Sequence, residues 1–312
     1  MDRASTAGCP NCTLDDNEII IDQGCEKMAN LETWAKLAAY VVAIGIGLEI
    51  AHRLYWKFNR AVVNANTSVP VKTILSSVFA CIPLAVALII TDAFCKYIDE
   101  TSLGALGITW HSDSLLHLST GMVIGCICVG VIFLVGCSMG WFRVSTSRFA
   151  SGDAASVPLF CGAMTDFFTS AVFEELTMRG YVFTVLNDAW GIPTAVYGSA
   201  VIFALFHLMK HPRIPLIFTT NAFVFGVLAA HSRAVTGTLW LPIGLHFGWN
   251  MAMGPILGLP CGGRTYEHGL VKCDVEGPQW VTGGDYSPDA GILGTVALII
   301  AATGLLALNP MG

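Results

Sequence analysis

Six ionisable or amide side chains lie within stretches of sequence that are otherwise apolar. They are Glu174, Glu175, Arg179, His207, His246 and Asn250. A charged residue near the centre of a bilayer costs about 2.5 to 3.5 kcal/mol on insertion scales. Such residues persist in apolar helices when they pair, face the interior of a helical bundle and serve a function there. Carboxylate, imidazole and amide groups together could activate a water and stabilise an oxyanion, which are the requirements of amide hydrolysis.

The two glutamates are adjacent, so on an α-helix they point about 100° apart and meet different neighbours. Arg179 follows Glu175 by four residues, the spacing at which opposite charges meet on one helical face. We therefore expect Glu175 and Arg179 to form a supporting ion pair, and Glu174 to act as the general base. The alternative is that both glutamates only pair with neighbouring helices.

His246 and Asn250 are also four residues apart, so an imidazole and an amide share one face of a helix. Both could donate hydrogen bonds to the oxyanion that forms when water attacks a carbonyl. His207 alone could be a packed core residue, but near Glu174 it could help to hold and deprotonate that water. The set predicts amide hydrolysis inside a membrane.

The composition places the chain in a bilayer. Of 312 residues, 54% are hydrophobic and 12% are charged, with a mean hydropathy of +0.65, whereas soluble domains contain about 25% charged residues. A net charge of -6 and 16 scattered lysines and arginines argue against nucleic acid as a partner. The expected partners are the lipid bilayer and a protein or peptide substrate, and the sequence leaves the oligomeric state open.

The predicted fold is an all-α, polytopic bundle of about eight transmembrane helices, since a span needs about 20 mainly apolar residues. The expected spans are 34–56, 71–96, 114–141, 158–187, 193–209, 214–231, 239–258 and 290–308. Residues 1–33 form a polar leader, and residues 34–312 form the membrane domain. The excess of lysine and arginine in the odd-numbered connections predicts that these face the cytoplasm. We expect an integral, multi-pass protein of the plasma membrane.

Three motifs carry a resemblance to a known family: EExxxRG (174–180), FxxxH (203–207) and HxxxN (246–250). In this order and at these separations they resemble the CPBP family of intramembrane endopeptidases, over about 158–258. That family includes type II CAAX prenyl endopeptidases, bacteriocin-processing proteins and lysostaphin-resistance-like proteins, and is often classed with the metalloproteases. The resemblance implies that Glu174 and His207 activate water, and that His246 and Asn250 bind the oxyanion. It implies that Glu175 and Arg179 are structural.

The dependence on a metal is open in the sequence. Glu174, His207 and His246 can also be interpreted as three zinc ligands, with Glu175 as the base. We favour a site without metal or cofactor, because Asn250 has a role there and none in the zinc scheme. His211 is a weaker possible ligand, since it precedes Pro212 at a helix end.

The chain departs from the family pattern at its leader and at the long connection 259–289. Cys9, Cys12 and Cys25 in the leader lack a fourth zinc ligand, so a disulfide is the better interpretation if the leader faces an oxidising compartment. Cys261 and Cys273 lie in a connection predicted to be cytoplasmic and should stay reduced. Two other functional classes remain: a transporter, which would also carry membrane-embedded Glu and His, and a family member that binds a membrane partner without cleaving it.

Overall fold

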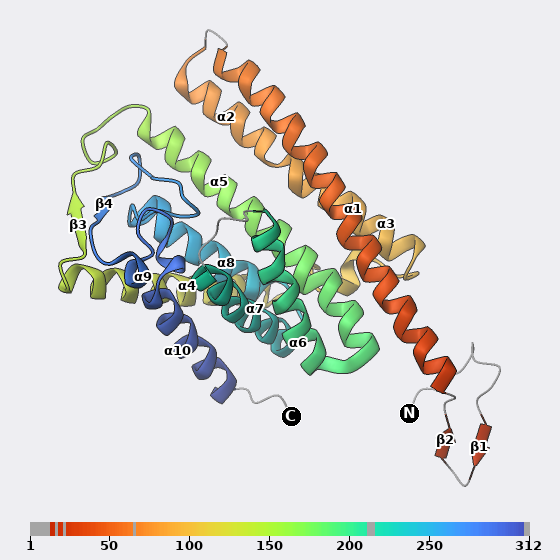
Figure 1. The fold of residues 1–312 in the computed structure, drawn as a ribbon. Coiled ribbons are helices and arrows are strands. Elements are labelled where there is room, and N and C mark those ends of the chain that lie inside the picture. Colours follow the sequence, from red (N-terminus) through yellow and green to blue (C-terminus); the bar gives the residue numbers. More distant parts are fainter. Residues whose placement is uncertain (1–12, 16–17, 21–22, 65–66, 211–215, 309–312) are drawn as a thin grey trace.

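The computed structural model describes residues 13–15, 18–20, 23–64, 67–210 and 216–308, which fold into a helical bundle (Figure 1). The α-helices are α1 (Gln23–Asn64), α2 (Val69–Ala80), α3 (Ile82–Tyr97), α4 (Ser114–Ser138), α5 (Ser156–Glu175), α6 (Phe183–Lys210), α7 (Leu216–Thr236), α8 (Trp240–Met251), α9 (Gln279–Thr282) and α10 (Ile292–Leu308). Two π-helical segments, η2 (Leu176–Val182) and η3 (Ala252–Ile256), and two 3₁₀ turns, η1 (Leu103–Leu106) and η4 (Pro288–Ala290), complete the helical structure. The predicted all-α class is confirmed.

Short strands form two antiparallel pairs within the described residues. Strands β1 (Thr13–Asp15) and β2 (Glu18–Ile20) pair before α1, which begins at Gln23 and so extends into the predicted leader. Strands β3 (Phe142–Ser145) and β4 (Lys272–Val275) pair with Phe142 opposite Val275. The second pair ties the connection after η3 to the segment that follows α4.

The eight predicted spans fall on helices in the predicted order, but eight membrane crossings are not confirmed. Four helical runs of the described residues are long and apolar enough to cross a membrane: Lys27–Val62, Val69–Tyr97, Ser114–Ser138 and Ser156–Leu208. Helix α8 has 12 residues and is about 18 Å long, against a hydrocarbon core of about 30 Å. The apolar helices nevertheless indicate an integral, multi-pass membrane protein.

The run Ser156–Leu208 is interrupted within α6. Gly191 has non-helical backbone angles, with φ at 80°, and Pro193 follows it. Proline begins a helix readily because its missing N–H is not needed in the first turn. The chain turns back at this point, so that α5 and the second half of α6 are separate helices of the bundle (Figure 1).

Helices α4 and α8 pack at very short range through facing glycines. Gly121 and Gly125 of α4 lie against the backbone of α8, while Gly244 and Gly248 of α8 lie against the backbone of α4. A Cβ atom at any of these four positions would collide with main-chain atoms of the other helix. Small residues four apart allow helix backbones to approach closely in membranes. This contact fixes α8, which carries His246 and Asn250.

Helices α1 and α3 and the residue Asp99 after α3 are joined to η2 through aromatic and polar groups. The rings of Tyr40 in α1 and Tyr181 in η2 stack with centroids 4.0 Å apart. Tyr181 donates a 2.8 Å hydrogen bond to Asp99, which also pairs with Lys36 at 2.5 Å. The hydroxyl groups of Tyr40 and Thr91 are 2.8 Å apart. These contacts hold the far side of the segment that follows the two glutamates.

Candidate active site

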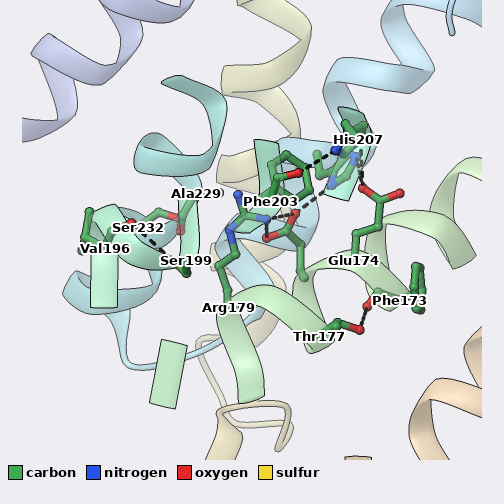
Figure 2. A network of polar contacts seen from close by, with 12 residues as sticks. Phe173, Glu174, Thr177, Arg179, Val196, Ser199, Phe203, His207, Ala229 and Ser232 are labelled. Atoms are coloured by element: carbon green, nitrogen blue, oxygen red, sulfur yellow. Dashed lines mark hydrogen bonds and ion pairs between the residues drawn. The ribbon is translucent and has the colours of Figure 1, made fainter. Parts of the chain in front are cut away.

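The four side chains predicted to do chemistry are brought together at one cavity of about 250 Å³. Glu174 comes from the last turn of α5, His207 from α6, and His246 and Asn250 from α8. Figure 2 shows Glu174 extending from its helix towards His207, with Arg179 and Phe203 beside them. Residues from three helices therefore converge, as the three motifs require.

Both motif helices change to π-helical geometry directly after their functional residues. The segment η2 begins one residue after Glu175, and η3 begins two residues after Asn250. A π-helical turn contains an extra residue and is often found at functional sites. In this chain the extra residue does not prevent the ion pair expected from α-helical spacing, because Arg179 still reaches back to Glu175.

Glu175 and Arg179 form a completely buried ion pair. Arg179 Nη1 lies 3.2 Å from Glu175 Oε2, and both side chains are 0% exposed, so the predicted pairing is confirmed. The guanidinium also lies over the ring of Phe203, 4.2 Å from its centroid, which is a favourable cation–π contact. Glu175 has a second partner that the sequence did not suggest: its Oε1 lies 2.7 Å from Nδ1 of His246.

Glu174 faces two imidazoles at equal distance. Its Oε2 lies 3.9 Å from Nε2 of His207 and 3.9 Å from Nε2 of His246. These separations exceed a direct hydrogen bond, and all three side chains line the cavity. The sequence suggested His207 as the partner of Glu174, and the structure places His246 equally close.

Each imidazole is oriented by a contact at its other nitrogen. His207 Nδ1 lies 3.0 Å from the carbonyl oxygen of Phe203. A carbonyl accepts hydrogen bonds and does not donate, so Nδ1 carries the hydrogen in this contact. His246 Nδ1 likewise faces the carboxylate of Glu175. Both Nε2 atoms are thereby directed at Glu174.

Asn250 lines the cavity one helical turn after His246. The thiol of Cys261 lies 3.9 Å from the Oδ1 atom of Asn250, which leaves the Nδ2 amide hydrogens for other acceptors. Cys261 belongs to the long connection 259–289. The connection therefore contributes to the site, although the sequence singled it out only as a departure from the family pattern.

Further residues of that connection form one wall of the cavity. They are Cys261, Gly262, Arg264, Tyr266, Tyr286 and Asp289. Asp289 accepts hydrogen bonds from Trp249 Nε1 at 2.8 Å and from the Ser287 hydroxyl at 3.1 Å, and Asn221 donates to its carbonyl oxygen at 2.7 Å. Burial raises the pKa of the Asp289 carboxyl to about 6, and the bonds from Trp249 and Ser287 oppose that rise. No local motif marks these residues as part of a site, so their place in the cavity could not be predicted from spacing.

The zinc interpretation fits the geometry poorly at one residue. In that scheme Glu175 is the base, yet both of its oxygens face Arg179 or His246, and it does not line the cavity. Within the part of the chain that the structure describes, no group of three or more His, Cys, Asp and Glu side chains is arranged to hold a metal ion. We therefore derive no step through a metal.

The sequence also singled out several cysteines and His211, and the structure describes only some of them. Cys9, Cys12 and His211 lie outside the described residues, and the backbone of Cys25 lies in α1. Cys261 and Cys273 are both free thiols. Burial raises the pKa of the Cys273 thiol to about 12, so this thiol stays protonated at neutral pH.

One comparison with known proteins gave a match. Residues 156–252 match the family model described as "Type II CAAX prenyl endopeptidase Rce1-like". Neither the curated proteins nor the solved structures gave a match. The family resemblance stated from the three motifs is thus confirmed, over residues that contain all six side chains of the site. The match implies a membrane protease of the CAAX type.

Proposed function

We propose, on the premise that residues 156–252 are a protease core of the Rce1-like family, that the chain is an intramembrane endopeptidase. It hydrolyses a peptide bond of a membrane-associated protein or of a peptide. The observation that carries this proposal is the position of Glu174 Oε2, 3.9 Å from the Nε2 atoms of both His207 and His246. Such a gap accommodates one water within hydrogen-bond distance of all three atoms.

In this scheme Glu174 is the general base. The carboxylate takes a proton from the water while Nε2 of His207 orients it, and the water oxygen attacks the carbonyl carbon of the substrate. A general base of this kind contributes about 10² to 10⁴ to the rate. The new C–O bond produces a tetrahedral intermediate with a negative oxygen.

His246 and Asn250 are the proposed donors to that oxygen. In the imidazolium form of His246 both ring nitrogens carry a hydrogen, so Nδ1–H donates to Glu175 and Nε2–H is left for the oxyanion. The Nδ2 amide of Asn250, on the same face of α8, supplies a second donor. When the C–N bond breaks, the proton held by Glu174 passes to the leaving amine, which restores the carboxylate.

The role of Glu175 and Arg179 is to position His246. The ion pair holds the buried carboxylate of Glu175 at a fixed place. The carboxylate in turn fixes the ring of His246 by the 2.7 Å contact with Nδ1. Neither side chain lines the cavity, so both act through the imidazole.

The test is a comparison of cleavage products in membranes. Cells expressing the wild-type chain and cells expressing Glu174→Gln would be compared by proteomics of protein N- and C-termini, at equal amounts of inserted protein. Termini that appear with the wild type and not with the variant would identify substrates, prenylated or not. Identical termini with both proteins would refute the protease function and favour a binding partner or a transporter.

A further inference from the structure

The wall of the cavity that the connection 259–289 forms carries a single strong positive charge. Of the described residues that line the cavity, Arg264 is the one lysine or arginine. The part of the lining that α5, α6 and α8 contribute carries Glu174 and the two imidazoles. A guanidinium presents five donors in a planar fork, which matches the two oxygens of a carboxylate. The cavity is therefore asymmetric in charge.

The backbone of Arg264 is fixed by a tight turn. Gly262 and Gly263 both have positive φ, 60° and 75°, as the central residues of a type I′ turn require. Cys261 N donates to the carbonyl of Arg264 at 3.0 Å, and Arg264 N donates to that of Cys261 at 3.2 Å. Gly263 N also donates to the carbonyl of Tyr286 at 2.7 Å. A residue held in this way loses little backbone freedom when it binds a ligand.

Aromatic contacts fix the turn relative to the helices. The ring of Tyr266 lies 5.6 Å from that of Phe167 in α5, and the ring of Tyr286 lies 5.2 Å from that of Phe218 in α7. Both tyrosines follow Arg264 in the chain, and all four rings line the same cavity. The guanidinium is thus carried on a rigid frame.

The side chain of Arg264 itself is exposed and forms no ion pair with the acidic side chains of the described residues. The neighbouring arginines of this face differ in that respect: Arg143 pairs with Glu276 at 2.8 Å, and Arg148 pairs with Glu267 at 3.3 Å. Asp166 of α5 interacts electrostatically with Arg264, but the two side chains do not form an ion pair.

We propose that Arg264 is a specificity-determining residue that binds a carboxylate of the peptide substrate. This inference rests on the proposed function, because it assigns the substrate to the cavity that contains Glu174. The carboxylate belongs either to the C-terminus of the substrate or to an aspartate or glutamate side chain close to the cleaved bond. In this proposal Arg264 holds the substrate from the connection 259–289, and takes no part in proton transfer.

The experiment measures binding separately from cleavage. The probes are three short fluorescent peptides with a common sequence and an S-farnesylated cysteine: one ends in a free carboxylate, one in a carboxamide, and one in a carboxamide with aspartate as its last residue. Their affinities would be measured in detergent micelles for protein carrying Glu174→Gln, with and without Arg264→Gln. The Glu174 change prevents turnover, so that only recognition is observed.

With arginine at position 264, we expect the free-acid peptide to bind about 10- to 100-fold more tightly than the carboxamide, the range typical of hydrogen bonds to charged groups. Arg264→Gln should remove this preference, and Arg264→Lys should keep part of it. The aspartate peptide separates the two sources: tight binding identifies a side-chain carboxylate, and weak binding identifies the C-terminus.

Arg143→Gln is the matched control, since Arg143 lies on the same face outside the cavity, and it should leave the preference unchanged. Equal binding of acid and amide, or binding of neither, would overturn the proposal. If Arg264 only balances the charge of Asp166, then Arg264→Gln should lower thermal stability, Asp166→Asn should restore it, and the preference should not change. If the Glu174→Gln protein prefers the free-acid peptide but the wild type cleaves none of the peptides, the result would support carboxylate binding by Arg264. It would at the same time count against the protease function.

Discussion

Glu175 and His246 are joined by a 2.7 Å contact between Oε1 and Nδ1, although they are 71 residues apart in the chain. The contact links a buried ion pair to the cavity, because Glu175 also pairs with Arg179 and His246 also faces Glu174. One continuous series of ionisable groups therefore runs from the core of the bundle to the cavity.

Glu174→Gln should lower peptide cleavage by about 10² to 10⁴, because the amide keeps the shape of the side chain and removes the base. Insertion into the membrane and thermal stability should be unchanged. The measurement is the single-turnover rate of purified protein in detergent. A variant that retains more than about a tenth of the wild-type rate would rule out the assignment of Glu174 as base.

Glu175→Gln and Arg179→Met should each destabilise the protein by about 3 to 5 kcal/mol, because each leaves a buried charge without its partner. The double variant should recover part of that loss, which a thermal unfolding cycle of the four proteins would show. The exposed pair of Glu49 and Arg53 on α1 has the same spacing and serves as control, since its loss should change little.

The activities of two substitutions at Glu175 test whether this residue positions His246. Glutamine at position 175 keeps an oxygen that can accept from His246 Nδ1, whereas leucine does not. We therefore expect Glu175→Leu to lose more activity than Glu175→Gln at equal amounts of folded protein. Equal activity of the two variants would contradict the positioning role of Glu175.

Removal of metal should leave the reaction unchanged. Treatment with 1,10-phenanthroline, compared with a non-chelating isomer, should have no effect on the rate, and active protein should contain well under one zinc per chain. His246→Ala and Asn250→Ala should lower the rate by similar factors, on the order of 10² to 10³, as expected for oxyanion donors. Zinc near one per chain, with activity lost on stripping and restored on addition, would make His207 and His246 ligands.

Gly248→Val should destabilise the protein by about 1 to 3 kcal/mol or more, because the added atoms would overlap the backbone of Met122 in α4. Since His246 and Asn250 lie on either side of Gly248, activity should fall together with stability. Gly130→Val on α4 is the control, as a Cβ there has no neighbour within 4 Å. Similar unfolding midpoints for the two variants would show that the close approach of α4 and α8 is not needed.

The Asp289 carboxyl predicts a pH dependence of stability. Its pKa is raised from the ordinary value of 3.8 to about 6 in the folded protein, so between these values the folded state binds more protons than the unfolded state. The contribution of this group to stability therefore falls as the pH rises from about 4 to 6. On going from pH 7 to pH 5, the wild type should gain thermal stability relative to Asp289→Asn. The Asp285→Asn variant changes an exposed residue of the same connection and keeps Asp289, so it should gain stability as the wild type does. Parallel behaviour of all three proteins would contradict the prediction.

Local spacing predicted part of the site, and tertiary structure decided the rest. The contact of Glu175 with Arg179 and the shared face of His246 and Asn250 follow from helix geometry alone. The bond from Glu175 to His246 depends on how α5 and α8 pack, which no spacing within either helix specifies. The wall formed by the connection 259–289 was missed for a similar reason: its lining residues have no common period and are brought to the cavity by turns and by the β3–β4 pair.

The two walls of the cavity come from different kinds of chain segment. The groups proposed to bind water and the oxyanion are spread over α5, α6 and α8, whereas Arg264 and its aromatic neighbours Tyr266 and Tyr286 come from one stretch between η3 and η4. Insertions or deletions in that stretch can change which peptides fit without moving Glu174, provided that β4 keeps its register with β3. During evolution, substrate preference can then diversify while the reaction is inherited unchanged. Chains that share these helices are therefore expected to differ most between η3 and η4.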